Sequence, residues 1–425
     1  MSILINAQSD TLSWLMVGGL LTAHEAAERL GVKPATLYAY VSRGLVRRER
    51  GADGRSLFLL SDVDRLARRG RRDRASGTEL RIESALTAIA DGAIFYRGED
   101  LLLLAVSRTF EEVAEFLWTG EFPERQPWAA DAGSPAAVAR VQAALPAGTL
   151  PLDRLRVAVA ALAALDPLRY DTSEAAVVVT GRRLIGAMVD ALPRRTRAAP
   201  PLRVRHPNAL SDSIAARLWA ALAGSRPPTG AVEALNAALV LVADHEMSVS
   251  TVAARMAASI AADPYAVVSV GLSALGGAMQ AVASLAVEDL LAEVASPELA
   301  APAVGERLRR GDRLPGFGHR LYPGGDPRAP ALLDLLRRRW HGHRRLAAIE
   351  AVITATGERG LPAPNIDFML ASLAHLAGMQ RGASEAIFGV ARTAGWLAHA
   401  MEEYERRTSI RPRAIYVGVP IGPER

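Results

Sequence analysis

The sequence predicts a mainly α-helical protein, in which a small winged helix-turn-helix module precedes a much larger helical body. Three observations predict this. Alanine and leucine dominate a chain of 425 residues, of which 5% are aromatic, and such a composition favours helix over strand. A helix, a short turn and a second helix can be recognised between residues 20 and 75. Helical periodicity then recurs along most of the chain, whose length allows two or three domains.

Composition excludes several classes of protein. There is no cysteine, so neither a disulfide framework nor a thiolate metal site is expected, and the eight histidines do not cluster at metal-ligand spacing. The apolar run Leu12–Leu21 has no basic region before it and is interrupted by Gly18, which makes it a poor signal peptide. No segment offers about 18 uninterrupted apolar residues. We therefore expect a cytoplasmic protein with no membrane span and no metal.

Positive charge is concentrated in one short stretch of the chain. The formal net charge is +5, yet the segment Arg43–Arg74 alone holds eleven arginines against five acids, a net of +6. The rest of the chain is therefore close to neutral, at −1. A local excess of this kind indicates an anionic partner for that segment.

The first helix of the helix-turn-helix is predicted to start near Thr22. Thr22 can cap a helix with Glu25 as its capping-box partner, and Gly31 closes that helix. Pro34 suits the first turn of a second helix, which ends at Gly44.

A wing follows the second helix. The segments Leu45–Glu49 and Arg55–Leu60 predict two strands around the turn 51–54, and Ser61 then caps a further helix. The whole resembles the winged helix-turn-helix of the MerR and excisionase type. That resemblance implies a second helix in the major groove, with these residues near DNA: Lys33, Thr36, Tyr40 and Arg43. It also implies phosphate contacts from Arg47, Arg48 and Arg55. The alternative is a module that packs on its neighbour with solvated arginines.

The helical body opens with a hairpin. Asp91-Gly92 predicts a two-residue turn between short strands. An amphipathic helix then ends at Gly120; its apolar face is formed by Phe110, Val113, Ala114, Leu117 and Trp118. Residues 124–230 are alanine-rich helical sequence with no chemistry to single out.

The sequence D-H-E-M-S lies within Leu235–Ile260, which reads as one long helix. Asp244 and His245 are flanked by apolar residues, so we expect part of this group to be buried. A histidine satisfied in the core by Asp244 is the structural alternative to a binding role. Further on, the adjacent glycines Gly276 and Gly277 within Gly271–Gln280 predict a close backbone contact or an opening onto a cleft.

A glycine-rich and proline-rich loop, Leu314–Ala329, is too broken for a helix or a strand. Gly316 and Gly318 are expected to leave backbone groups open to a ligand. His319 follows, and Arg328 offers a planar cation for a carboxylate. The alternative is a solvated turn.

Two candidate residues lie on later helices. Asp367 begins a helix that runs to Leu376, either as a cap or as a carboxylate made more basic by partial desolvation. Arg392 lies among apolar residues, which is costly unless an anion meets it. Helices are also predicted at Ala331–Trp340 and Arg344–Ala355.

Together these stretches resemble the citrate synthase family. Eight pieces occur in family order: I-F-Y-R-G, F-E-E-V-A-E-F-L-W-T-G-E-F-P, A-D-H-E-M-S-V-S-T, G-F-G-H-R-L-Y-P, D-P-R-A, N-I-D-F, A-R-T-A-G-W-L-A-H and R-P-R-A-I-Y-V-G. The resemblance implies a homodimer that condenses acetyl-CoA with oxaloacetate to citrate and CoA, with acetyl-CoA as a substrate and no cofactor. It implies a helix-turn-helix domain at 20–75, a large domain at 78–281 and 379–425, and a small domain at 282–378.

The resemblance assigns roles one residue at a time. His245 would bind oxaloacetate, His319 would polarise its ketone, and Asp367 would take the proton from the acetyl methyl. The carboxylates would be held by three arginines, of which the last comes from the partner subunit: Arg328, Arg392 and Arg411. The adenine of CoA would contact the backbone of Leu314, Gly316, Phe317 and Gly318.

The sequence departs from the family pattern at Gln280. The family has a histidine there that stabilises the enol, and no histidine occurs between His245 and His319. Glutamine can donate a hydrogen bond but cannot supply a proton near neutral pH. Val242 departs too, where many members have a second histidine. Three hypotheses follow: an enzyme acting on oxaloacetate and acetyl-CoA or a related acyl-CoA, a metabolite sensor that regulates DNA binding, and a partner subunit of an active relative.

Overall fold

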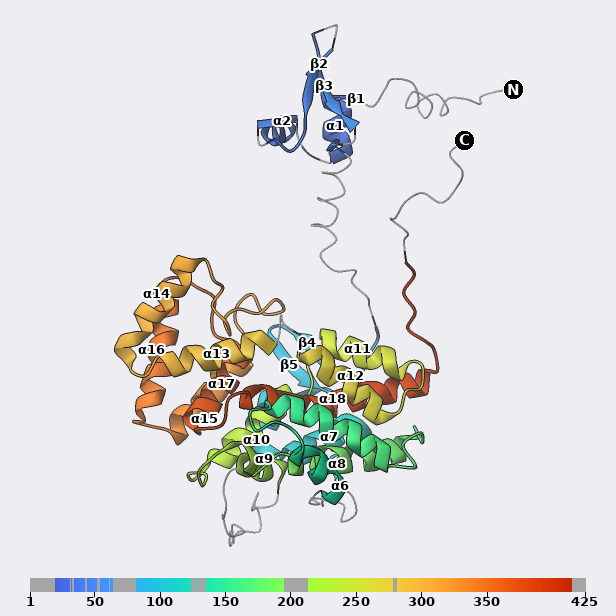
Figure 1. Ribbon diagram of the computed structural model, residues 1–425, viewed down its shortest axis with the longest axis vertical. Helices are drawn as coiled ribbons and strands as arrows, with labels where there is room; N and C mark the ends of the chain where they lie inside the picture. The colour runs from blue at the N-terminus through green and yellow to red at the C-terminus, as the bar shows by residue number, and fades with distance from the viewer. Residues whose placement is uncertain are drawn as a thin grey trace, which may run out of the picture. The chain divides into compact units, whose positions relative to one another are not determined.

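The computed structural model describes residues 20–30, 32, 34–42, 44–51, 54–60, 62–63, 82–123, 128, 135–194, 213–277 and 281–414. The chain forms two compact units, Met1–Ile82 and Glu83–Arg425, and each is described by itself (Figure 1). None of the helices in the described ranges is long and apolar enough to cross a membrane.

The first unit is a small sheet packed on two helices. The helices are α1 (Ala23–Leu30) and α2 (Pro34–Ser42), and the strands, in the order β1-β3-β2, are β1 (Leu20–Thr22), β3 (Ser56–Leu59) and β2 (Arg48–Arg50). Both neighbouring pairs are antiparallel. The predicted capping box is confirmed, because Thr22 N donates to Glu25 Oε2 at 2.8 Å and Glu25 N donates to Thr22 Oγ1 at 3.4 Å.

The first wing strand begins later than predicted. It starts at Arg48, whereas the sequence predicted Leu45. Val46 is buried in the core of this unit beside Leu37 and Phe58, and Arg47 N donates to the Asp62 carboxylate at 3.1 Å. Val46 is therefore held by the interior, whereas Arg47 joins β3 through its carbonyl, which accepts from Leu59 N at 3.4 Å. The predicted cap at Ser61 lies outside the described residues.

The second unit opens with the predicted hairpin. Strands β4 (Thr87–Ala90), β5 (Ala93–Tyr96) and β6 (Glu99–Asp100) form an antiparallel sheet in that order. Asp91 and Gly92 have φ of 50° and 80°, the positive values that a type I′ turn requires at both central positions.

Helices form the rest of this unit. They are α4 (Leu101–Ser107), α5 (Phe110–Thr119), α6 (Pro135–Ala143), α7 (Pro151–Leu165), α8 (Glu174–Asp190), α9 (Ile214–Leu222), α10 (Ala231–Val242), α11 (Val249–Ala258), α12 (Pro264–Leu275), α13 (Ala281–Glu293), the 3₁₀ turn η2 (Pro297–Leu299), α14 (Ala300–Arg310), α15 (Arg328–Arg339), α16 (Arg344–Gly357), α17 (Ile366–Leu376) and α18 (Ala383–Arg406).

The predicted amphipathic helix is α5. Thr109 and Glu112 form a capping box at its start, and Gly120, with φ of 80°, ends it in the left-handed conformation. Its apolar face is buried as predicted. Trp118 also donates from Nε1 to Ala394 O at 2.9 Å, which ties α5 to α18.

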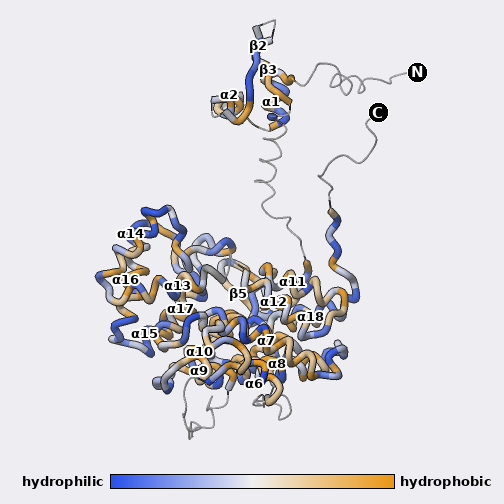
Figure 2. The backbone as a smooth tube through the Cα atoms, in the orientation of Figure 1, coloured by the Kyte–Doolittle hydropathy of each residue, from blue (hydrophilic) through white to orange (hydrophobic). Residues whose placement is uncertain are grey.

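Helix α18 is the centre of this unit. Its residues are buried almost continuously from Ala383 to Ala400, and it contacts α5, α7, α8, α10, α11, α12, α13 and α17. Helices α13 to α17 lie together on one side of it (Figure 1). Figure 2 shows apolar residues along α8, α9 and α10, and hydrophilic runs on α14 and α15. The body is therefore organised around one long buried helix.

The single helix predicted over Leu235–Ile260 is wrong. Helix α10 ends at Val242 and α11 begins at Val249. Ser248 caps α11 by accepting from Thr251 N at 3.3 Å, and Glu246 has φ of 49°. Because a non-glycine residue at positive φ cannot continue a helix, the D-H-E-M-S segment forms a loop, which positions His245.

Candidate functional site

Three aromatic rings meet where the D-H-E-M-S loop faces the glycine-rich loop. The ring centroids of His245 and His319 are 5.3 Å apart, and that of Tyr322 lies 5.6 Å from the first and 4.7 Å from the second. His245 Nε2 and Tyr322 Oη are joined by a 2.7 Å hydrogen bond. Two of the histidines predicted for the site are thus brought together from segments more than 70 residues apart.

His319 is set up as a neutral hydrogen-bond donor. Leu321 N donates to His319 Nδ1 at 3.2 Å, so the proton of the neutral ring is on Nε2. Burial, with the nearby charge of Arg328, lowers the pKa of His319. The ring therefore stays uncharged near neutral pH and offers one N–H to a ligand.

Arg328 is fixed at the start of α15. Its Nε and Nη2 donate to the two carboxylate oxygens of Asp326 at 2.9 and 2.8 Å. Asp326 also accepts from Ile366 N at 3.1 Å, which ties the glycine-rich loop to the start of α17. Burial alone would raise the pKa of Asp326, but Arg328 outweighs it and the pKa is lowered. Among the described residues, none accepts from Arg328 Nη1, so this nitrogen can meet a ligand.

Arg392 is a buried cation that forms no ion pair with a carboxylate of the described residues. It is 1% exposed, and its Nε donates to Val242 O at 2.9 Å while its Nη1 donates to Ser248 Oγ at 3.4 Å. Its guanidinium lies 4.6 Å from the Phe388 ring centroid. Burial lowers the pKa of Arg392. Such a cation is costly unless an anion joins it, as the sequence predicted.

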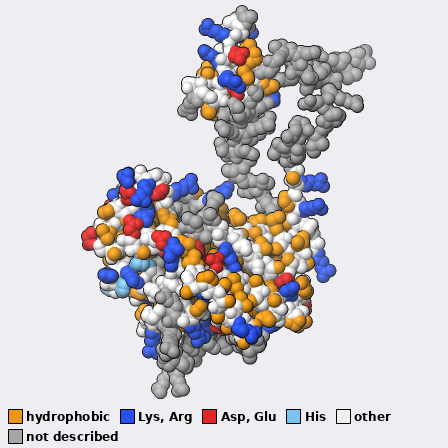
Figure 3. Space-filling model, in the orientation of Figure 1, with side chains coloured by type: hydrophobic (Ala, Val, Ile, Leu, Met, Phe, Trp, Pro, Cys, Tyr) orange, Lys and Arg blue, Asp and Glu red, His pale blue; other side chains and the backbone are white. Residues whose placement is uncertain are grey.

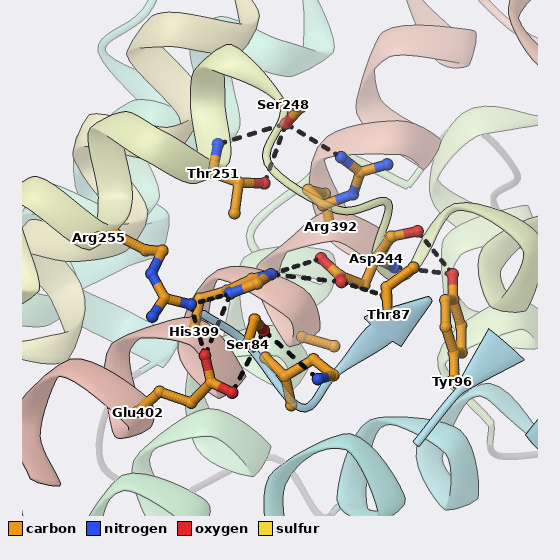
Figure 4. Close-up of polar contacts among 12 residues, drawn as sticks. Ser84, Thr87, Tyr96, Asp244, Ser248, Thr251, Arg255, Arg392, His399 and Glu402 are labelled. Carbon is orange, nitrogen blue, oxygen red and sulfur yellow. Dashed lines mark hydrogen bonds and ion pairs between the residues drawn. The ribbon is translucent and has the colours of Figure 1, made fainter. Parts of the chain in front are cut away.

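The carboxylate nearest to Arg392 is engaged elsewhere. Asp244 is fully buried and lies 3.2 Å from His399 Nε2. It also accepts from Thr87 Oγ1 at 2.5 Å, and its backbone oxygen accepts from Tyr96 Oη at 2.7 Å. Figure 4 shows these partners converging on Asp244 from β4, β5 and α18. The structural alternative, in which Asp244 satisfies His245, is therefore wrong: Asp244 pairs with His399.

His399 continues into a second ion-pair network. Its Nδ1 lies 2.5 Å from Arg255 Nη1, and Arg255 Nε donates to Glu403 Oε1 at 2.7 Å. Glu402 accepts from the same Arg255 Nη1 at 2.5 Å and from Ala85 N at 2.8 Å. The buried network links α11, α18 and the start of the sheet (Figure 4), so it holds the base of the loop that carries His245.

The Asp244–His399 pair predicts a pH dependence of stability. Burial and the charge of Arg255 oppose the charge on His399, but Asp244, with Glu402, outweighs them and raises the pKa, while the pKa of Asp244 is lowered. Stabilisation by His399 is therefore complete below its unfolded pKa of about 6.5 and is lost as pH rises through the folded value. Stabilisation by Asp244 is present above about pH 3.9, its unfolded pKa. It is lost as the pH falls through the lowered pKa of the folded state. Urea unfolding should show a plateau between these limits.

Replacing His399 tests this pair. His399→Gln should remove the alkaline decline in the free energy of unfolding, and His399→Ala should cost about 3–5 kcal/mol, since it leaves a buried carboxylate unpaired. His375→Gln is the control. Burial lowers the pKa of His375 to about 4, so this change should affect only the acid side of the profile. An alkaline decline that persists in His399→Gln would contradict the assignment.

Asp367 is not the cap of its own helix. The cap of α17 is Asn365, whose Oδ1 accepts from Asp367 N at 3.0 Å and from Phe368 N at 3.3 Å. Burial raises the pKa of the Asp367 carboxyl, although Arg328 opposes this. No described residue donates a hydrogen bond to its carboxylate. The cap alternative is therefore wrong, and the role of the carboxylate as a base stays a prediction.

The expected openness of the glycine backbone is wrong in most of Leu314–Gly318. Gly318 N donates to Ala363 O at 2.8 Å, and Asn365 donates to both glycines, from N to Gly316 O and from Nδ2 to Gly318 O, each at 2.9 Å. A Cβ on Gly316 would lie 2.8 Å from Phe368 Cβ. These glycines therefore allow close packing against 363–368. Phe317 packs its ring 4.9 Å from that of Phe368, and Leu314 is half-buried.

Arg411 lies apart from this cluster. It is exposed on the segment after α18, where Ile410 N donates to Ser259 Oγ. Gln280 lies outside the described residues. The close contact predicted for the adjacent glycines before it is confirmed at Gly276, where a Cβ would overlap the Arg156 guanidinium.

Sequence reasoning missed Tyr322, Asp326 and His399. The first two stand within the glycine-rich loop, at three and seven residues after His319. The D-P-R motif signalled Asp326, because a carboxylate two residues before an arginine can pair with it in a turn. His399 gave no such signal, since its partner Asp244 is 155 positions away.

The residues predicted to contact DNA differ in their surroundings. Arg48 and Arg55 are exposed, and Thr36 and Tyr40 are half-buried. Arg47 is paired with the buried Asp62, with Nε 2.8 Å from Oδ2, so its charge already has a partner. Lys33 and Arg43 lie outside the described residues.

Comparison with known families matches both parts of the chain. The family described as "Citrate synthase, C-terminal domain" matches residues 78–413, and the one described as "Helix-turn-helix domain" matches residues 20–71. The first match covers the whole site described above.

Individual proteins and solved structures are also similar to this chain. The chain is 31% identical to "Citrate synthase 2" of Bacillus subtilis over 354 residues, 79% of this chain and 93% of the relative. It is 31% identical to a "2-methylcitrate synthase" of Mycobacterium tuberculosis, over 77% of this chain and 85% of the relative. Among solved structures, citrate synthase of Thermoplasma acidophilum, in a ternary complex with carboxymethyl coenzyme A and oxaloacetate, has a TM-score of 0.66 at 24% identity. That alignment covers 82% of this chain and 98% of the other, and it shows the shared fold.

Proposed function

We propose, from the premise that this chain belongs to the citrate synthase family, that it condenses an acyl-CoA with oxaloacetate. The reaction consumes water and gives citrate, or an alkyl-substituted citrate, and free CoA. One observation carries the proposal: two buried arginines, two histidines and a half-buried aspartate of raised pKa interact with one another from two loops, the starts of α15 and α17, and the middle of α18. This set of groups fits a dianionic keto acid beside a carbon acid.

Oxaloacetate would be bound mainly by the two buried arginines. Arg328 Nη1 and Arg392 would bind its two carboxylates, since the charge of Asp244 is taken up by His399. His319 would donate from Nε2 to the ketone oxygen, where negative charge develops as the new bond forms. His245, held by Tyr322, would bind the same substrate.

Asp367 and Gln280 would act on the acyl-CoA. Asp367 would take a proton from the carbon next to the thioester, and that carbon would then attack the ketone carbon. The amide of Gln280 would donate a hydrogen bond to the thioester oxygen but could not transfer a proton. Water then cleaves the thioester and releases CoA as a thiol. Leu314 and Phe317 would lie against the adenine, while Gly316 and Gly318 hold this loop through their hydrogen bonds to Ala363 and Asn365.

The domain division and the oligomeric state are proposed from the same family membership. We propose that 78–281 and 379–425 form a large domain, that 282–378 form a small domain, and that the chain is a cytoplasmic homodimer. The partner's Arg411 would complete the carboxylate site, which agrees with the exposed position of Arg411 after α18.

Thiol release tests the reaction. The full chain should release CoA only when an acyl-CoA and oxaloacetate are both present, and citrate or its homologue should appear in equal amount. Acetyl-CoA and propionyl-CoA serve as the two acyl donors. Release of CoA without a new carbon–carbon bond would indicate a thioesterase and would overturn the proposal.

DNA binding is a second candidate function, favoured by the match of residues 20–71 to a helix-turn-helix domain. Arg48→Ala should then weaken binding to duplex DNA uniformly across sequences and reduce the salt slope of log K by about 1. Arg309→Ala, on α14, is the control. If oxaloacetate shifts the DNA affinity at fixed salt, the chain is also a metabolite-responsive regulator; if the wild type shows no salt-dependent binding, this candidate is wrong.

A further inference from the structure

We propose that Glu288 and Glu385 form a pH-sensitive contact between α13 and the start of α18, which is stable when the two carry one negative charge and is weakened when they carry two. The two carboxyl groups come from helices far apart in the sequence and act on one another. In the domain division proposed above, α13 lies in the small domain and α18 in the large one, so the contact joins the two. None of the residues assigned to substrate binding or catalysis belongs to it.

Glu288 caps α18 from another helix. The N-cap residue of α18 is Gly382, which has no side chain to accept from the first turn. Glu288 Oε2 accepts from Gly382 N at 2.7 Å, and its Oε1 accepts from Ser384 N at 3.0 Å and from Ser384 Oγ at 2.5 Å. A carboxylate is favoured here because the N-terminus of a helix carries positive partial charge. One ionised side chain therefore fastens α13 to the long buried helix.

Glu385 places a second carboxyl group in the same first turn. It is 4% exposed, and its Oε1 has no hydrogen-bond partner among the described residues. Because Glu288 already accepts from the free N–H groups of this helix end, a charge on Glu385 would be buried beside a like charge. Burial, followed by the charge of Glu288, raises the pKa of Glu385 to about 7. Glu385 can therefore gain or lose its proton near neutral pH.

The bases that face this carboxyl group are engaged elsewhere. From α7, Arg156 Nη1 donates to Asp153 Oδ1 at 2.7 Å, and its Nη2 donates to Leu272 O at 3.0 Å. From the segment before α18, Arg381 Nη2 donates to Asp289 Oδ2 at 3.0 Å. Both arginines act against the rise in the pKa of the carboxyl group and Asp153 adds to it, but the rise remains.

Exposed acids on α13 differ from Glu385 in having basic partners and water around them. Glu293, at the end of α13, accepts from Arg307 Nη2 at 2.8 Å. Figure 3 shows acidic and basic side chains interspersed over α13 and α14. Surface pairs of this kind contribute little to stability, because water and salt screen them. Glu293 is therefore a matched control for the buried pair.

Hydrogen–deuterium exchange of the full chain tests the proposal, because the N–H groups of Gly382 and Ser384 donate directly to Glu288. The protection factor of peptides covering 378–390 is compared at about pH 6 and about pH 8, after correction for the intrinsic exchange rate. The pKa of Glu385 is about 7 in the folded chain and about 4.3 where the contact has opened. Protection in the wild type should therefore fall about 10-fold between the two conditions.

Three variants assign this fall to the pair. Glu385→Gln keeps the shape of the side chain without its charge and should show no fall. Glu288→Gln should show a smaller one, since a main cause of the raised pKa of Glu385 is then gone. Glu293→Gln should behave as the wild type does.

The opposite results contradict the proposal. Equal protection of the wild type at both pH values, or an equal fall in Glu385→Gln, would overturn the role of Glu385. A fall of the same size in peptides from every helix would show global unfolding and would overturn a contact confined to α13 and α18. The measurement uses no substrate, so its outcome is independent of whether the chain condenses an acyl-CoA with oxaloacetate.

Discussion

Replacing Asp367 with asparagine is expected to lower kcat by about 10²–10⁴-fold, the contribution of a well-placed general base. The amide keeps the shape of the side chain but cannot take a proton. In the wild type, burial raises the pKa of Asp367, so kcat should fall as pH drops through that raised value. The measurement is CoA release against pH, with both variants saturated in oxaloacetate.

A second readout separates catalysis from folding. Asp367→Asn should bind oxaloacetate with little change, because the carboxylates are held by Arg328 and Arg392, and loss of solvent deuterium exchange at the acyl carbon should accompany the loss of turnover. Asp326→Asn is the contrasting variant. It removes the partner of Arg328 and should weaken oxaloacetate binding. Unchanged turnover in Asp367→Asn would contradict its assignment as the base.

Replacing Gln280 with histidine is expected to raise kcat by about 10–100-fold. Loss of one well-placed oxyanion donor costs about 10²–10³ in rate, and the amide of glutamine should already recover part of that. The imidazole supplies the hydrogen-bond donor that the family pattern has at this position. The measurement is the rate of CoA release at saturating oxaloacetate.

Comparing Gln280→His with the wild type also tests whether the wild type is a synthase. If only Gln280→His releases CoA, the wild type is not a synthase, and the DNA-binding candidate gains. If the change lowers an existing rate, the site is adapted to glutamine. Gln280→Ala is the control, because it removes the amide without adding an imidazole, and it should be slower than the wild type.

Local features were predictable from the sequence because their causes are local. The Thr22–Glu25 capping box and the Asp91-Gly92 turn depend on residues at most three apart, and both form as expected. The start of α17 is similar, except that Asn365 and not Asp367 is the cap. Hydrogen bonds within one turn leave few alternatives for the chain.

Features set by distant contacts were not predictable. Apolar periodicity continues through 243–248, yet the helix breaks there, since Asp244 is held by Thr87 and His399 from other elements. The backbone of Gly318 is likewise occupied by Ala363 and Asn365. The resemblance predicted that His245, His319, Arg328 and Arg392 share one site, but it gave no sign of the ion pairs that hold them.

The central claim is that the buried cations of this site bind a small keto dicarboxylate, and calorimetric titration of the full chain with oxaloacetate tests it most directly. We expect saturable uptake of one oxaloacetate per chain, weakened by at least about 10-fold in Arg392→Leu, which removes one charged contact and keeps the apolar packing. Absence of uptake by the wild type, or equal affinity in Arg392→Leu, would contradict the claim.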